Sequence, residues 1–167
     1  MTLVLKEGLN ADDVQAVAQR IWDRGKREVE RFGYGDPVSL AAVLVASRPE
    51  YAFTLESVGE PVAAFGAFRL EGGSYRSYFL ATDAFIPVAK EATRLLRSFL
   101  KRETALRPDC RLECLSASDH PDSERWFKLL GFYSAEPLNG LSRYIYGLTG
   151  ATRPAIFPPL GDAQRPE

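Results

Sequence analysis

The chain has 167 residues, the length of one domain with a sizeable hydrophobic core. Hydrophobic residues make up 46% and charged residues 26%, which is a globular rather than a disordered composition. The net charge of −1 gives no basic footprint for nucleic acid, and no stretch reaches the roughly 18 apolar residues that span a bilayer.

The two cysteines, Cys110 and Cys114, stand four residues apart in the sequence. Because both lie on one face of a predicted strand, they are badly placed to form a disulfide with each other. We therefore expect them to be small buried hydrophobic residues of a protein in a reducing, cytoplasmic compartment. With a single histidine in the chain, a zinc site built by the protein is not expected. The stretch Met1 to Glu7 contains no secretory leader.

Strand and helix signals alternate from the N-terminus onward. Leu3 to Leu5 predicts a short strand, and Asn10 predicts the cap of a helix whose apolar stripe continues to Phe32. Within it, the basic run Arg24 to Arg27 lies among acidic residues and predicts a solvated helix face. After a glycine-rich turn, Asp36-Pro37 predicts the start of a second helix.

Three strands are predicted next, over 51–58, 61–70 and 74–81, as an antiparallel meander joined by glycine turns. A long helix follows, with apolar residues at helical spacing from 85 to 99.

The C-terminal part is predicted as strand 110–116, a helix ending at 130, and strands 132–135 and 141–148. The sequence therefore predicts a mixed α/β (α+β) domain over residues 1–148 with a mostly antiparallel sheet. The strands before and after the long helix should be parallel neighbours joined by a right-handed crossover. Residues 149–167 are rich in proline and predict an extended tail.

The segment Arg111 to His120 predicts a buried strand and a loop, and Pro121 to Phe132 predicts an amphipathic helix with a glycine stop. This order, ending in Leu-Gly-Phe, resembles the C-terminal half of the GNAT-type N-acetyltransferase fold. With Thr82-Asp83 and Arg125-Trp126, the chain looks most like the phage-encoded acetyltransferase-like proteins, including the internal virion type. The resemblance implies a central sheet flanked by helices and an acetyl-CoA site.

The family grips the coenzyme A diphosphate with a loop of the type Gln/Arg-x-x-Gly-x-Gly/Ala. The matching residues here are Pro87-x-x-Lys90-x-Ala92, of which only Ala92 fits. Pro87 removes an N–H group where amide donors are needed. Lys90 is either a surface lysine or a point charge that replaces the lost amides on the phosphate.

Family enzymes often place a proton-donating tyrosine where this chain has Phe127. His120 lies where a polar residue commonly contacts the cofactor, although His120-Pro121 also reads as a loop that opens a helix. Tyr133 offers a hydroxyl group or ordinary strand packing. His120 and Tyr133 are thus candidates for catalysis, and His120 also for cofactor binding.

A general base is expected from the strand before the long helix, but residues 74–82 contain no carboxylate. Asp83, just beyond, is better explained as a helix cap. The remaining candidates, Glu56 and Glu113, lie in neighbouring strands and either reach a central cleft or face solvent and ion pairs.

In the tail, Ile156, Phe157 and Leu160 stand among prolines and predict a stiff apolar hook for a protein partner or a large assembly. Two functions follow. The first is a GNAT-fold protein with a degenerate site and no cofactor, used as an assembly component of a phage particle. The second is an N-acetyltransferase that uses acetyl-CoA to modify a primary amine.

Overall fold

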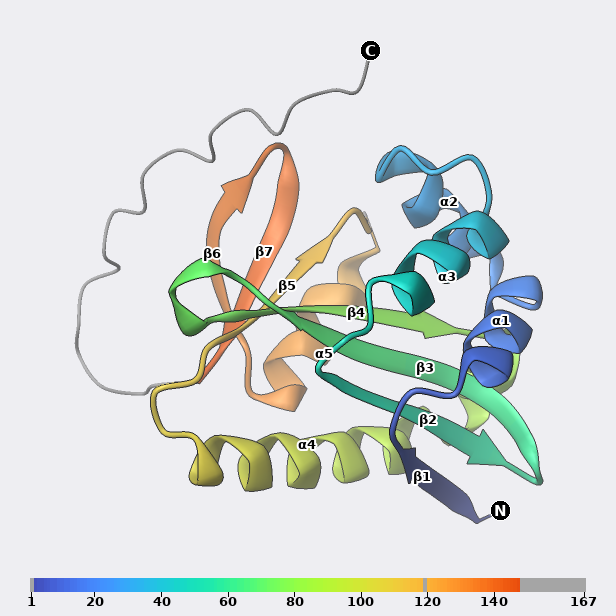
Figure 1. Ribbon diagram of the computed structural model, residues 1–167, viewed down its shortest axis with the longest axis horizontal. Coiled ribbons are helices and arrows are strands. Elements are labelled where there is room, and N and C mark those ends of the chain that lie inside the picture. The colour runs from blue at the N-terminus through green and yellow to red at the C-terminus, as the bar shows by residue number, and fades with distance from the viewer. Residues whose placement is uncertain (1, 119, 148–167) are drawn as a thin grey trace.

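The computed structural model describes residues 2–118 and 120–147 (Figure 1). Their strands form one sheet of order β1-β2-β3-β4-β5-β7-β6, in which β4 and β5 are parallel and the other neighbouring pairs are antiparallel. The strands are β1 (Leu3–Glu7), β2 (Tyr51–Ser57), β3 (Glu60–Arg69), β4 (Tyr75–Ala81), β5 (Leu112–Ser116), β6 (Tyr133–Leu138) and β7 (Leu141–Tyr146).

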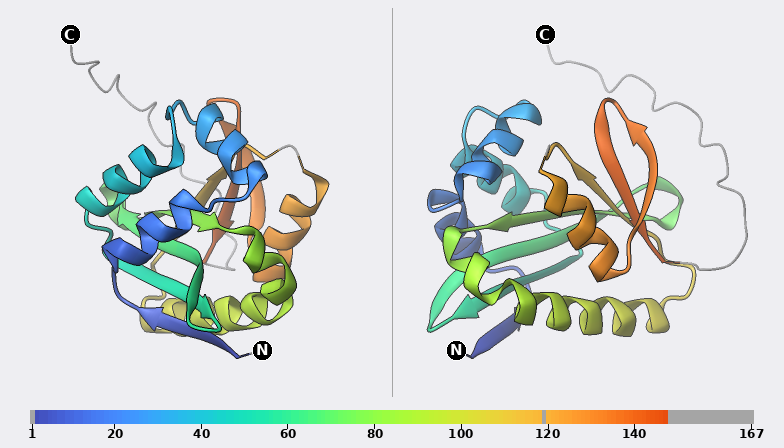
Figure 2. Two further views of the ribbon diagram at one scale, coloured as in Figure 1. Left: turned by 90° about the vertical axis from the view of Figure 1, so that its right-hand side faces the viewer. Right: turned by 180° about the vertical axis from the view of Figure 1, so that it is seen from behind.

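Helices cover both faces of this sheet (Figure 2). One face carries α4 and α5, and the other carries α1, α2 and α3. The helices are α1 (Ala11–Gln19), α2 (Asp23–Arg31), α3 (Pro37–Ala46), α4 (Ala89–Leu106) and α5 (Pro121–Leu130), with short 3-10 turns η1 (Glu71–Gly73) and η2 (Asp83–Val88). The prediction of a mixed α/β architecture with a mostly antiparallel sheet is confirmed. No helix of the described residues is long and apolar enough to cross a membrane.

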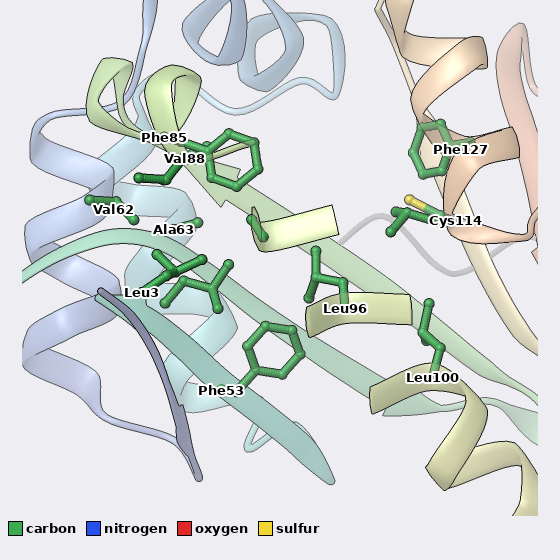
Figure 3. Close-up of a cluster of buried hydrophobic side chains, with 14 of the residues drawn as sticks. Leu3, Phe53, Val62, Ala63, Phe85, Val88, Leu96, Leu100, Cys114 and Phe127 are labelled. Atoms are coloured by element: carbon green, nitrogen blue, oxygen red, sulfur yellow. The ribbon is translucent and has the colours of Figure 1, made fainter. Parts of the chain in front are cut away.

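The larger core lies between the sheet and the α4–α5 layer (Figure 3). Phe53 from β2 and Leu96 from α4 are almost fully buried in it, and Phe127 from α5 packs against the same cluster. The smaller core on the opposite face joins α1 and α3 to β3 and β4. Since both faces of β3 and β4 are covered, their alternate residues are buried on either side.

The local start and stop signals are largely confirmed. The Asn10 side chain accepts hydrogen bonds from the Asp12 and Asp13 amides at the start of α1. Gly131 ends α5 in the left-handed region, at φ 101°. Asp83, expected to cap the long helix with its side chain, instead begins η2, whose cap position makes no side-chain hydrogen bond.

The single long helix predicted from residue 10 to residue 32 is wrong, because the chain breaks at Ile21-Trp22. Ile21 bridges to Thr82, and the Trp22 N–H donates to the Ala81 carbonyl at 3.1 Å. These two backbone contacts tie the break to the end of β4. A tertiary hydrogen bond thus overrides a helical pattern that continues in the sequence.

Two tyrosines of β4, Tyr75 and Tyr78, differ in whether their hydroxyl groups have a hydrogen-bond partner. The Tyr75 hydroxyl donates to Glu50 Oε1 at 3.1 Å, whereas the buried Tyr78 hydroxyl has no partner among the described residues. The Tyr78 ring lies over Gly66, where any Cβ would approach it to 2.1 Å. Burial raises the pKa of Tyr78 to about 12, so this phenol stays protonated.

Replacing each tyrosine by phenylalanine should therefore shift stability in opposite directions. Tyr78→Phe removes a buried, unsatisfied hydroxyl and is expected to raise the free energy of unfolding by about 1 kcal/mol, or the melting temperature by roughly 2–4 °C. Tyr75→Phe, the matched control on the same strand, should lower it by about 1 kcal/mol. Differential scanning calorimetry measures both, and a loss of stability in Tyr78→Phe would contradict this account.

Candidate functional site

The feature that defines the site is the short pairing between β4 and β5. The two strands pair over three residues only, Tyr75–Ser77 against Leu112–Cys114. Beyond this point β4 runs on to Ala81 and β5 to Ser116 without pairing to each other. The strands therefore separate into a wedge that begins at Ser77 and Cys114, which we call the β4–β5 split.

On the α4–α5 side, aromatic rings stand over the split. The Trp126 ring of α5 lies 5.0 Å from Phe79 of β4 and 6.2 Å from Phe85 of η2, between ring centroids. The Trp126 Nε1–H donates to Thr93 Oγ1 of α4 at 3.0 Å. A narrow apolar cavity of about 30 Å³, lined by Ser77, Cys114 and the rings of Phe79 and Trp126, lies beneath. We call it the near cavity.

Phe127, at the position where a proton-donating tyrosine was considered, belongs to the core. Its side chain is 7% exposed and its ring stacks on Tyr144 with centroids 4.1 Å apart. It therefore packs α5 onto β7, and it has no proton to exchange.

Glu113, a candidate base, is held by two arginines. Its Oε1 accepts from Arg76 at 2.6 and 3.0 Å, and its Oε2 accepts from Arg143 at 2.6 Å. Burial alone would raise the pKa of Glu113, but the hydrogen bonds from Arg76 and Arg143 outweigh it and keep the pKa below its ordinary value. The carboxylate is thus a fixed anion that joins β4, β5 and β7 rather than a group poised to take a proton.

The other candidates lie away from the split. Glu56 forms an ion pair with Lys6 of β1, and β3 separates its strand from β4. Tyr133, 46% exposed, starts the edge strand β6 and pairs opposite Ile145. His120 caps α5, because its Nδ1 accepts the Asp122 N–H at 3.2 Å. Among the described residues, then, the structure does not bring Glu56, Glu113, His120 and Tyr133 together.

The start of α4 offers few free amides to an anion. Pro87 has no N–H, and the Ala89 N–H already donates to the Ile86 carbonyl. Ala92 is fully buried in the core below the helix. Lys90 is exposed and makes no ion pair within residues 2–118 and 120–147. These residues suit a diphosphate held by a lysine side chain, and they suit a backbone cradle poorly.

Arg24, expected on a solvated helix face, takes part in a contact that the sequence analysis missed. Its guanidinium donates to Ser123 Oγ at 2.7 Å and to Ser118 Oγ at 3.4 Å, and the two hydroxyls are 2.8 Å apart. This cluster ties α2 to the start of α5 at the wide end of the split. The basic run predicts charge but not this partner, which lies more than 90 residues away.

No family model matches the sequence, and no curated protein matches it. Solved structures do match over most of the chain. The GNAT domain of S. lividans PAT is 14% identical, with a TM-score of 0.65 over 87% of this chain and 89% of that one. An acetyltransferase from Thermus thermophilus is 19% identical, with a TM-score of 0.61 over 89% and 98%.

The fold is GNAT-like. A further match, the aminoglycoside acetyltransferase AAC(6')-Ib solved in complex with coenzyme A, is 12% identical and has a TM-score of 0.58 over 87% of this chain and 95% of that one. At such identities the likeness concerns the fold.

Replacement of Glu113 tests how much its ion pairs with Arg76 and Arg143 contribute to stability. Glu113→Gln leaves two guanidinium groups without their anion and should cost about 2–4 kcal/mol at pH 7. Because the folded-state pKa is lowered, this contribution is complete above the ordinary value of 4.5 and is lost as pH falls below it. The deficit relative to the wild type should therefore shrink under acid conditions.

Urea denaturation at pH 7 and at successively lower pH measures this deficit. Glu60→Gln, which removes the exposed partner of Arg20, is the matched control and should cost less than about 1 kcal/mol. Equal losses in the two variants would contradict a buried, ionised Glu113.

Proposed function

We propose that the chain binds acyl-CoA at the β4–β5 split and transfers the acyl group to a primary amine. The observation that carries this proposal is the separation of β4 from β5 after three paired residues. Half of the backbone groups of Tyr78–Leu80 point away from β3 and find no strand partner there, because successive residues alternate in direction. Such amides are suited to bind a ligand in an extended conformation and the oxygen of a reacting carbonyl.

The coenzyme would supply an acyl group activated as a thioester. A neutral amine attacks the carbonyl carbon, the carbon–nitrogen bond forms, the carbon–sulfur bond breaks, and the amine's proton leaves with the thiol. Positioning rather than acid–base catalysis carries the rate here, because Phe127 has no proton and Glu113 is held by its arginines. Lys90 would contact the diphosphate. A primary amine as acceptor is supported by the spermidine N-acetyltransferase SpeG of Vibrio cholerae, which is among the proteins with this fold.

Thermal shift with acetyl-CoA tests this proposal. At about 100 times the dissociation constant the ligand should add roughly 2.7 kcal/mol, which raises the melting temperature by roughly 5–10 °C. Lys90→Glu should abolish most of the shift. Lys101→Glu, the same charge reversal farther along α4, should leave it intact. Release of free thiol in the presence of a primary amine then measures transfer.

An unchanged melting temperature at millimolar acetyl-CoA would overturn the acyltransferase function. It would favour the second candidate, a non-catalytic protein of this fold in a reducing, cytoplasmic compartment or in a phage particle. The filled aromatic wedge around Trp126 supports that candidate, while the solved structures reported above lend no support to a virion role. Its partner-binding residues, Ile156, Phe157 and Leu160, lie outside the described residues.

The second candidate makes its own prediction. If the tail joins the protein to an assembly, deletion of residues 150–167 should reduce the sedimenting mass to that of one chain, while the full chain sediments as a larger species. Analytical ultracentrifugation compares the two, and circular dichroism checks that the shortened chain is folded. The same mass for both proteins would count against a tail-mediated assembly.

A further inference from the structure

A second cavity adjoins the one at the split. This far cavity, of about 50 Å³, lies beneath the C-terminal half of α4. It shares three wall residues with the near cavity: Phe65, Phe99 and Leu100. The two cavities are therefore neighbours with these three side chains between them, and together they mark an apolar path from Ser77 and Cys114 to the region under α4, away from the wide end of the split.

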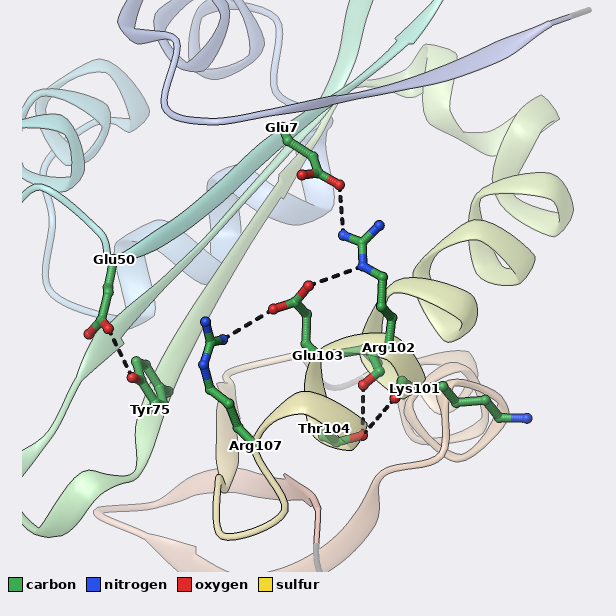
Figure 4. Close-up of polar contacts among 9 residues, drawn as sticks. Glu7, Glu50, Tyr75, Lys101, Arg102, Glu103, Thr104 and Arg107 are labelled. Atoms are coloured by element: carbon green, nitrogen blue, oxygen red, sulfur yellow. Dashed lines mark hydrogen bonds and ion pairs between the residues drawn. The ribbon is translucent and has the colours of Figure 1, made fainter.

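The far cavity has apolar walls and a polar rim, and Figure 4 shows the Glu103–Arg107 pair of that rim. Tyr51, Tyr75 and Tyr146 contribute rings to the walls. At the rim the Arg107 guanidinium lies 4.4 Å from the Tyr51 ring centroid and pairs with Glu103 at 3.1 Å. This charged pair marks the outer end of the path. Since water needs several polar partners in a cavity, these walls suit a hydrocarbon better.

We propose that this path receives the alkyl part of an acyl group longer than acetyl, which makes a short-chain acyl-CoA the donor. The inference rests on the proposed function, because the thioester carbonyl must lie at the split for its chain to point under α4. An apolar cavity of roughly 150 Å³ holds the six carbons of benzene, so cavities of this size accept about three or four. A butanoyl group, with three carbons beyond the carbonyl, matches that capacity, and a hexanoyl group, with five, slightly exceeds it and would reach the rim of the far cavity.

The affinity of the full chain for a series of coenzyme A esters tests the inference. Isothermal titration calorimetry with acetyl-, butanoyl-, hexanoyl- and decanoyl-CoA should show affinity rising about three- to fourfold per buried methylene up to butanoyl or hexanoyl. Decanoyl-CoA should gain nothing further, because the rim pair ends the path. Equal affinity for all four esters would overturn the inference and leave the acyltransferase proposal standing.

A variant that fills the far cavity sharpens this test. Thr104 lines the far cavity from α4, so Thr104→Leu should remove the preference for hexanoyl-CoA and keep the affinity for acetyl-CoA. Ser98→Leu, at an exposed position on the same helix that lines neither cavity, is the matched control. A hexanoyl preference that survives in Thr104→Leu, with both variants folded by circular dichroism, would also overturn the inference.

The rate at which Cys110 is alkylated shows whether the far cavity is occupied, independently of the affinity measurements. Its thiol is free, half-buried and part of the far cavity, whereas Cys114 is buried beside the near one. Hexanoyl-CoA should slow the alkylation of Cys110 by a small maleimide at least threefold, and acetyl-CoA should not, with the modified peptide identified by mass spectrometry. Equal protection by both esters counts against the path. Absence of binding by every ester would instead refute the proposed function itself.

Discussion

The separation of β4 from β5 is the constraint on which the rest of the site depends. A parallel pair needs a long crossover, and the 18 residues of α4, about 27 Å of helix, supply it. Past the paired residues β4 stays paired with β3 and β5 with β7. Thr82, just after β4, bridges to Ile21, and Arg24 holds Ser118 just after β5. Beyond both strands the chain therefore contacts the same short segment, residues 21–24, at the wide end of the split.

The aromatic rings over the split fit either a ligand site or a filled core. The free energies of the contacts that hold Trp126 allow the two to be compared. Trp126 is held by one neutral hydrogen bond to Thr93, which contributes about 1 kcal/mol. Its ring also contacts three phenylalanines, and each such pair contributes roughly 0.5–1.5 kcal/mol. A coenzyme A ester with micromolar affinity brings roughly 8 kcal/mol of binding free energy. Such a ligand has already met the cost of moving the indole within its net binding free energy, so under the proposed function the rings form a movable wall rather than a permanent plug. Phe127, stacked on Tyr144 in the core, has no comparable freedom.

The sequence predicts a helix, strand or contact well when the residues that determine it lie close together in the chain. Periodicity and caps predict α3, α5 and the meander of β2, β3 and β4, because their signals lie within a few residues. The break at Ile21-Trp22 depends on a backbone bond to Ala81, about 60 residues away, and no local pattern encodes it. Glu113 is a candidate base by type and position, but Arg76 and Arg143 lie 37 and 30 residues from it. Its charge partners become visible only when the sheet is assembled.

Under the proposed function, the pairing of Glu113 with two arginines leaves the deprotonation of the amine to the surroundings of the acceptor. With that carboxylate fixed and Phe127 in the tyrosine's place, neither of these two residues is placed to exchange a proton with a ligand at the split. A primary amine is protonated in water, so it must lose its proton before it attacks. An apolar surrounding lowers the pKa of an amine, because burial disfavours the charged form. Under the proposed function, the rings of Phe79 and Trp126 thereby favour the neutral amine without donating or accepting a proton.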